Sequence, residues 1–401
     1  MSWKILCPKA KCKDLKMSTF ETVELIHKEH WEKVLSNSKG NIFLSLEYLK
    51  ALEIAMVDTL EFRYLIFYNE KLQPVSLAVV QIMVINNESI DIQSYLSGLG
   101  ETITKNILDV GTMRLMVCGN IFTTGENGFC HTKEVDGKVA YDNLSKGLYK
   151  LRQSEEENGK ISFLLLKEFF PETIKASRQL EKANFRPFEI DVNMVMPIAK
   201  SWDSFDDYLS NMTSKFRTKA KGVLKKSKAL SIREMHVNEI RENSDRIYEL
   251  YLAVMNQASF NFGALEKEAF CSFKEHLGPN FVFKGYYLED ELIGFSSAFL
   301  CHQLVDASFV GIDYDYNIEH CLYQRMLYDL VDLSISKDAE ELRLGRTAEE
   351  IKSGIGAFPI NMHLYMRHRN AVSNKLLKPI IEAISPSEFE VRQPFKIQTA
   401  Q

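Results

Sequence analysis

The stretch that decides the fold reads FVFKGYYLEDELIGFSSAFL, residues 281–300. Two runs rich in aromatic and β-branched residues flank a polar turn at Glu289 and Asp290, a pattern typical of a β-hairpin. Two helical patterns precede it, RIYELYLAVMNQ (246–257) and KEAFCSFKEHL (267–277). Strand and helix patterns then alternate: a strand VDASFVGID (305–313), a helix over 318–336, a strand ELRLG (341–345), a short helix AEEIKSG (348–354) and a strand INMHLYMRH (360–368). The second half of the chain is therefore predicted to be a mixed α/β unit.

The first half of the chain follows the same plan. Its hairpin joins FRYLIFY (62–68) to LQPVSLAVVQIMVI (72–85) across Asn69, Glu70 and Lys71. In both halves the second arm begins Leu-x-(Pro or Gly)-apolar, at 72–75 and at 292–295, so a structural duplication is the simplest interpretation. The other expected elements are a strand at 18–26, helices at 28–35 and 45–55, a helix near 141–157, a strand ISFLLL (161–166), a helix at 171–183 and a strand FRPFEIDVNMVMPI (185–198).

The segment SFDDYLSNMTSKFRTKAKGVLKKSKAL (204–230) predicts an amphipathic helix between the halves. Residues 215–228 contain seven basic residues and no acidic ones, and Arg217, Lys221 and Lys225 fall in one stripe. A solvated helix face is the default interpretation; the functional ones are a site for carrier phosphates or an acidic carrier protein, an anionic membrane surface, or RNA. The expected organisation is a first domain at 1–198, a basic linker helix at 199–230 and a second domain at 231–401.

Composition limits the classes of partner and location. The chain has 401 residues, with 49 basic against 54 acidic ones and a net charge of −5, so the chain as a whole is not expected to bind nucleic acid. Seven cysteines without paired metal-ligand spacing indicate a reducing cytoplasm and no metal site. The most apolar run, VSLAVVQIMVI (75–85), is too short to span a membrane, and no signal-peptide core is present. The expected location is cytoplasmic, with peripheral contact at the inner membrane face left open.

The strand 305–313 and the helix after it carry the first candidate for a ligand site. Free N–H groups at a helix N-terminus bind phosphates, and Gly311 near the strand end would let a ligand approach the backbone. A single strand glycine is also common at a bulge. Transfer of an acyl group from a thioester to an amine needs a phosphate anchor, donors for the oxyanion and a base, but no enzyme nucleophile.

Residues 319–365 contain the runs EHCLYQ (319–324), GRTAEEIK (345–352), IGAFP (355–359) and NMH (361–363). With these runs the segment resembles the FemAB-like branch of the GNAT superfamily, the branch of peptidoglycan biosynthesis or recognition that includes bacterial ceramide synthases. The family's Glu-x-Cys-Tyr-Tyr-Gln is matched by EHCLYQ (319–324), and its Gly-Ala-Gln-Gly-Glu-His-Lys by GRTAEEIK (345–352). IGAFP (355–359) and NMH (361–363) match the two runs that follow. The chain departs from the pattern at Leu322, at Ile351 in place of a histidine, and by one extra residue between 345 and 350. The linker run SFDDYL also resembles the family.

The resemblance implies a fold and an activity. The expected fold class is α/β (α+β), with tandem GNAT-like domains, each a mixed, mostly antiparallel sheet flanked by helices. The expected reaction moves an acyl group from acyl-CoA, or from an acyl carrier protein, to a small-molecule or lipid amine, with acyl-CoA as the preferred co-substrate and a sphingoid-type base as the leading acceptor. Arg217, Lys221 and Gly311 are the candidates to bind the donor.

The resemblance also implies site residues. Because the family's histidine is missing, the base is expected to be Glu350, Glu319 or His320, and Tyr323 could donate a proton to the leaving thiolate. The substrate-binding candidates are Cys321, Arg346, Lys352 and His363. Each also has an ordinary interpretation: an acid in the first turn of a helix, a solvated arginine, or a structural histidine on an apolar strand.

Two rival functions are also compatible with the sequence. One is a Fem-type aminoacyl transferase of peptidoglycan synthesis, in which the basic helix would hold aminoacyl-tRNA. The other is a non-catalytic GNAT-like binding module, which the missing histidine suggests. Tight, salt-sensitive binding of tRNA would favour the first, and turnover with any thioester would exclude the second.

Overall fold

The computed structural model describes residues 16–38, 41–86, 112–257, 263–382 and 389–396. Within these ranges 13 strands form one sheet, in the order β1-β2-β3-β4-β6-β13-β7-β12-β11-β10-β9-β8, with β5 paired to β3. The strands are β1 (Met17–Phe20), β2 (Glu61–Tyr68), β3 (Pro74–Asn86), β4 (Thr112–Cys118), β5 (Phe129–His131), β6 (Ile161–Phe169), β7 (Arg186–Pro197), β8 (Leu230–Glu234), β9 (Phe281–Leu288), β10 (Glu291–Cys301), β11 (Leu304–Ile312), β12 (Glu341–Arg343) and β13 (Phe358–His368).

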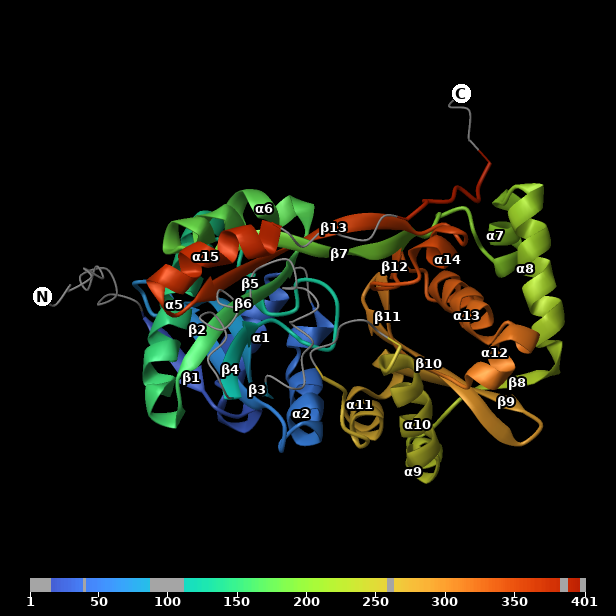
Figure 1. Cartoon of the computed structure of the whole chain (residues 1–401), viewed down its shortest axis with the longest axis horizontal. Helices are drawn as coiled ribbons and strands as arrows, with labels where there is room; N and C mark the ends of the chain where they lie inside the picture. Colours follow the sequence, from blue (N-terminus) through green and yellow to red (C-terminus); the bar gives the residue numbers. More distant parts are fainter. Residues whose placement is uncertain (1–15, 39–40, 87–111, 258–262, 383–388, 397–401) are drawn as a thin grey trace, which may run out of the picture.

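Helices cover both faces of the sheet (Figure 1). The α-helices are α1 (Lys28–Ser36), α2 (Leu46–Ala55), α5 (Gly137–Ser154), α6 (Pro171–Ser177), α7 (Phe205–Asn211), α8 (Ser214–Lys226), α9 (Val237–Glu242), α10 (Ser244–Met255), α11 (Ala269–Leu277), α12 (Tyr314–His320), α13 (Leu322–Ser336), α14 (Glu349–Ser353) and α15 (Ala371–Glu382). Short 3-10 helices lie at Val23–Leu25, Ile42–Leu44, Glu155–Asn158, Arg178–Ala183, Ser227–Ala229 and Gly278–Asn280. No helix in the described ranges is both long and apolar enough to cross a bilayer.

The duplicated plan predicted from the hairpins is present in both halves. The hairpin β2–β3 turns through 69–73 and the hairpin β9–β10 turns at Glu289 and Asp290, as expected. Each half then has a parallel strand pair joined through helices: β4 and β6 through α5, and β11 and β12 through α12 and α13. All other pairings are antiparallel, so the sheet is mixed and mostly antiparallel, as the sequence predicts.

The strands β7 and β13 join the two halves into one sheet, which the sequence did not predict. β13 lies between β6 and β7, with His368 opposite Phe163 of β6 and Phe358 opposite Val195 of β7. The end of β7 then pairs with β12, where Val195 lies opposite Arg343. Figure 1 shows β7 and β13 running side by side from one half to the other.

Several predicted elements differ from the structure, among them the helix expected at 171–183, which ends as an α-helix at Ser177 and continues as a 3-10 helix. The helix expected over 318–336 is divided at Cys321, whose left-handed backbone (φ 51°) ends α12 and begins α13. The single linker helix is divided into α7 and α8, because Met212 is extended and forms a bridge with Phe395. The strand expected at 18–26 ends at Phe20 and is followed by a 3-10 turn, which buries Val23.

The hydrophobic core is continuous between the halves on one face of the sheet. There α2 of the first half packs against α11 of the second. The rings of Tyr48 and Phe273 stack with centroids 5.3 Å apart, and Ser272 Oγ donates to the carbonyl of Ala51 at 2.9 Å. On the other face α5 covers the first half, and α13 with α8 covers the second. Close-packed aromatic contacts of this kind therefore fix one half against the other.

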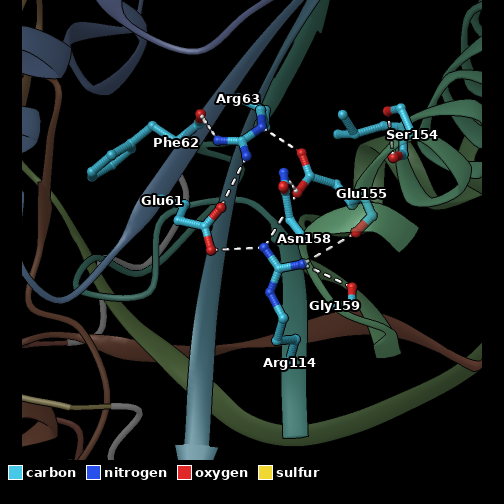
Figure 2. Close-up of polar contacts among 9 residues, drawn as sticks. Glu61, Phe62, Arg63, Arg114, Ser154, Glu155, Asn158 and Gly159 are labelled. Atoms are coloured by element: carbon cyan, nitrogen blue, oxygen red, sulfur yellow. Dashed lines mark hydrogen bonds and ion pairs between the residues drawn. The ribbon is translucent and has the colours of Figure 1, made fainter.

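A largely buried ionic network ties the 3-10 helix Glu155–Asn158, which directly follows α5, to the first half of the sheet (Figure 2). Arg63 Nε donates to Glu155 Oε1 at 2.6 Å, and Arg114 Nη2 lies 3.2 Å from Glu155 Oε2. Glu61 bridges the same two guanidinium groups at 2.9 and 2.7 Å. Burial alone would raise the pKa of Glu155, but Arg63 and Arg114 outweigh it and hold that pKa below its ordinary value. The network pairs two cations with two carboxylates and has a structural role.

Candidate functional site

The parallel strands β11 and β12 pair over only three residues and then separate. The pairs are Leu304 with Glu341, 305 with 342, and Asp306 with Arg343. β11 continues to Ile312, whereas the chain after Arg343 stays beside β7. There the Leu344 N–H donates to the Met194 carbonyl, and the Met194 N–H donates to the Gly345 carbonyl. Ligands of open α/β sheets bind at the carboxyl ends of strands, where neighbours diverge. This divergence is the candidate site.

A buried carboxyl group lies at the base of the divergence. Asp306 is 4% exposed, and Ser308 Oγ donates to its Oδ1 at 3.2 Å. Burial raises the pKa of Asp306 to about 7, although Arg343 and the Ser308 hydroxyl favour the ionised form. Arg343 itself donates to Glu341 at 2.6 Å, and its guanidinium lies 4.5 Å from the centroid of the Phe170 ring. A carboxyl group that titrates near neutral pH is suited to accept a proton from a substrate.

The first half of the chain contributes a second acid to this region. Glu168 is 2% exposed and has a left-handed backbone (φ 56°) at the end of β6. Its Oε2 accepts the Gly125 N–H at 2.7 Å, and its Oε1 lies 3.3 Å from Lys167 Nζ and 3.9 Å from Arg346 Nη1. Arg346 follows β12, so this contact connects the turn after β12 to the first half. A non-glycine residue in this conformation is uncommon and is often found at functional sites.

The equivalent divergence in the first half is filled by a side chain of the protein itself. β4 and β6 are parallel, and β4 ends at Cys118 opposite Leu166. The next residue of β6, Lys167, is buried, and its ammonium donates to the carbonyls of Asn120 and Thr123 at 2.8 Å each. Burial lowers the pKa of Lys167 to about 8. Because this ammonium binds the loop that leaves β4, the corresponding position between β11 and β12 is the better candidate for a ligand.

The turn from 345 to 352 has an unusual backbone. Gly345 (φ 67°), Thr347 (φ 64°) and Ala348 (φ 52°) are all left-handed. Lys352 of α14 is buried, and its ammonium donates to the carbonyls of Gly345 and Arg346. Burial lowers its pKa to about 7; a neighbouring acid opposes this shift and Arg346 adds to it. Lys352 therefore holds the turn in place and titrates near neutral pH.

The start of α13 lies near this turn. The Tyr323 N–H donates to Asn317 Oδ1 at 3.0 Å, which satisfies one of the free donors at the helix start. Burial raises the pKa of Tyr323 well above its ordinary value, and the charges of Tyr314 and Glu349 add to the effect. Glu349 belongs to α14, next to the predicted site residues Glu350 and Lys352. Its influence on Tyr323 therefore indicates that the start of α13 and the 345–352 turn border the same region. With this raised pKa, Tyr323 keeps its hydroxyl proton at neutral pH.

The other residues predicted around these two segments are more exposed. Glu350 is exposed and forms an ion pair with Arg392 at 2.7 Å. Glu319 is exposed on α12, and the half-buried His320 ring lies 6.4 Å from the Tyr316 ring. Cys321 is half-buried at the break between α12 and α13. Glu350 and Glu319 therefore face solvent, unlike the buried Asp306 and Glu168.

Four predicted residues lie apart from the divergence or face another neighbour. His363 of β13 lies 3.2 Å from Glu189 of β7, away from the 345–352 turn. Gly311 is buried in regular pairing with β10, and a Cβ there would lie 2.2 Å from the Phe295 ring. Packing against this ring, rather than a bulge, explains the glycine. On α8, Arg217 donates to the Ser210 carbonyl at 3.4 Å and Lys221 is exposed.

The sequence interpretation did not identify Asp306, Glu168, Lys167 or Asn193. The sequence does contain a signal for the charged ones, because charged residues interrupt apolar strand patterns, as Lys-Glu does in LLLKEF (164–169). Burying a charge costs free energy unless the charge is paired or has a function. Asn193 of β7 is 0% exposed, yet neither its amide oxygen nor its amide nitrogen has a hydrogen-bond partner. Its neighbour Met194 pairs with the 344–345 backbone, so Asn193 lies beside the divergence. A buried amide without partners is a group that a ligand could satisfy.

The fold is similar to that of several solved structures. The crystal structure of FemX superposes with a TM-score of 0.57 at 10% identity, over 90% of this chain and 100% of that one. A tandem GNAT protein from the clavulanic acid biosynthesis pathway gives a TM-score of 0.51 at 6% identity, over 89% and 99%. A conserved protein of unknown function from Bacteroides thetaiotaomicron gives 0.50 at 10% identity, over 88% and 99%. No protein-family model and no curated protein matches the sequence. The likenesses confirm the predicted fold of two GNAT-like units in tandem.

Proposed function

We propose that this chain is an N-acyltransferase that acts at the divergence of β11 and β12. An amine attacks the carbonyl carbon of an acyl thioester, the new C–N bond replaces the C–S bond, and the thiol leaves with the proton lost by the amine. The observation that carries the proposal is the separation of two parallel strands beside a buried carboxyl group that titrates near neutral pH. A neutral thioester can lie between such strands, because their backbone groups no longer bind each other.

The roles of the residues follow from their chemistry. Asp306 is the base that accepts the amine proton, since its pKa of about 7 leaves it about half ionised at neutral pH and able to take up a proton. The Asn193 amide offers a donor for the oxyanion of the tetrahedral intermediate. Tyr323 and Lys352 position the start of α13 and the 345–352 turn on the other side of the donor. Arg346 links this turn to Glu168.

The simplest acyl donor for this reaction is acyl-CoA, and the proposed acceptor is the amine of a lipid base. The choice of acceptor rests on the motif resemblance at 319–324 and 345–352. The fold is compatible with other acyl and aminoacyl transfers, so the acceptor is decided by experiment. A Fem-type reaction would use aminoacyl-tRNA in place of the thioester.

The test is turnover with defined substrates. Purified protein is incubated with acyl-CoA of several chain lengths and a panel of amines that includes sphingoid bases, and free thiol is followed with a chromogenic reagent. Release of thiol that depends on both the amine and the protein, together with the N-acyl product by mass spectrometry, is the expected result. Transfer from aminoacyl-tRNA without thioester turnover would replace the proposal with the Fem-type reaction. Binding without any turnover would leave only a binding module.

A further inference from the structure

The helix α8 presents an exposed basic surface. Lys215, Lys219, Lys221, Lys225 and Lys226 are exposed, and Lys228 of the following 3-10 turn is exposed as well. Within the described part of the chain, none of these six lysines forms an ion pair. The chain carries a net charge of −5, so without the seven basic residues of 215–228 the remainder carries −12. The surface is therefore a local positive patch on an acidic protein, and its partner is expected to be anionic.

This surface borders the candidate site. Phe216, Ala220 and Val223 bury the opposite face of α8 in the core that α13 shares. At the C-terminal end of α8, Arg325 of α13 donates to Ser227 Oγ at 3.1 Å. α12 also contacts α8, and Figure 1 shows α8 along the outer edge of the second half with α12 and α13 beside it. A partner bound to α8 would therefore also meet the start of α13, which borders the candidate site.

An exposed apolar side chain lies next to the basic surface. Ile318 of α12 is 83% exposed, the highest exposure of any large apolar side chain in the described ranges. Asp315 and Glu319, on the same short helix, are exposed too. An apolar residue surrounded by charges of both signs has the composition of a protein interface, in which an apolar centre is enclosed by a polar rim.

The same features argue against a bilayer and against RNA. A uniformly anionic surface would be repelled by Asp315 and Glu319 where Ile318 makes contact, whereas a folded partner can place neutral or basic groups there. The exposed cations of α8 are lysines, and its one arginine donates to the backbone of α7. Arginine is the residue favoured for forked recognition of phosphates and for stacking on bases.

We propose that α8 and α12 form the docking surface for an acidic protein that carries the acyl group as a thioester. The inference rests on the proposed function and specifies the donor: acyl-CoA would act as a smaller substitute for this carrier. Acidic residues of the carrier face the lysines of α8, Ile318 contacts an apolar patch on it, and its thioester arm reaches the divergence of β11 and β12. The reaction is then acyl-S-carrier plus amine giving N-acyl amine plus carrier thiol.

The experiment compares two donors with the same acyl chain, acyl-CoA and an acyl carrier protein. A variant with Lys219, Lys225 and Lys226 changed to glutamate is expected to raise KM for the carrier-protein donor by about tenfold or more, with kcat and acyl-CoA turnover unchanged. The matched control changes Lys133, Lys138 and Lys175, exposed lysines of the first half, to glutamate and should alter neither KM. Ile318→Ser should raise the carrier KM without changing its dependence on salt.

Binding is measured separately from turnover, by fluorescence anisotropy of a labelled holo carrier protein. Binding that weakens in the α8 variant, without turnover of any thioester, would keep the docking surface and reject the acyltransferase. Acyl-CoA turnover with carrier binding unaffected by the α8 variant would reject the docking surface alone. An equal rise in both KM values would assign the lysines to CoA phosphates. Tighter binding of tRNA, or of phosphatidylglycerol vesicles, than of the carrier would also overturn the proposal.

Discussion

Replacing Asp306 with asparagine should make the protein more stable and inactive. The pKa of Asp306 is about 7 in the folded protein against an ordinary value of 3.8. A difference of about three units, at about 1.4 kcal/mol per unit, places an upper limit of about 4 kcal/mol on the stability that ionisation removes. Asparagine has nearly the same shape and can still accept the Ser308 hydrogen bond, but it does not ionise.

The sign follows from proton binding. Between about pH 3.8 and pH 7 the folded protein holds the Asp306 proton and the unfolded chain does not, so this carboxyl group lowers stability as the pH rises. The free energy of unfolding of Asp306→Asn should therefore exceed that of the wild type by an amount that grows by about 1.4 kcal/mol per pH unit over this range. Above about pH 7 the difference should level off.

The assay is urea unfolding at a series of pH values, together with thioester turnover at pH 8. Loss of a general base is expected to lower kcat by about 10²–10⁴-fold. Asp332→Asn, the same substitution on an exposed residue of α13, is the control and should change neither quantity. A variant that is less stable than the wild type at pH 8 and still active would refute both the burial argument and the assignment of the base.

Three further predictions use the same assays. With Asp306 as the base, Glu350→Gln only breaks an exposed ion pair and should leave kcat within about twofold; a loss near 10²-fold would make Glu350 the base instead. In the unfolded chain Lys352 keeps its proton to about pH 10.5, whereas in the folded protein it loses it above about pH 7, so the free energy of unfolding of the wild type should rise between these two values. The variant Lys352→Met should lack this rise, which urea unfolding at pH 7 and pH 9.5 measures. Glu155→Gln leaves two buried arginines short of a partner and should cost about 3–5 kcal/mol at neutral pH, measured as a lower urea midpoint; an unchanged midpoint would show that the network of Figure 2 adds no stability.

The sequence predicted the elements whose patterns are local. Both hairpins and the tandem plan were predicted from alternation and helical spacing, whereas β4 and the two parallel pairings were not. The break at Cys321 was missed, because Ile318 through Leu322 fits a helical pattern and the left-handed residue is not a glycine. The pairing of β13 between β6 and β7 was missed because register between strands distant in the sequence leaves no local signal.

Two segments named from the sequence lie beside the candidate site, and the roles expected of their residues stay predictions. The 345–352 turn and the start of α13 carry motif residues, and these segments border the divergence. Asp306 and Glu168 were missed because a charged residue in a strand is expected to face solvent. Only the pairing and packing of neighbouring elements shows that both are buried. Glu350 was favoured from the motif, yet it lies exposed beside Arg392. Spacing reports which residues share an element, whereas burial depends on what packs over it.

The position of β13 has a consequence for biosynthesis. Strands β6 and β7 have both been synthesised once the ribosome reaches Pro197. The strand that pairs between them, β13, is complete only at His368. Until then both strands present unpaired edges, which favour aggregation. Synthesis of residues 1–198 alone should therefore give an insoluble product. The order of the strands thus makes the two halves a single folding unit.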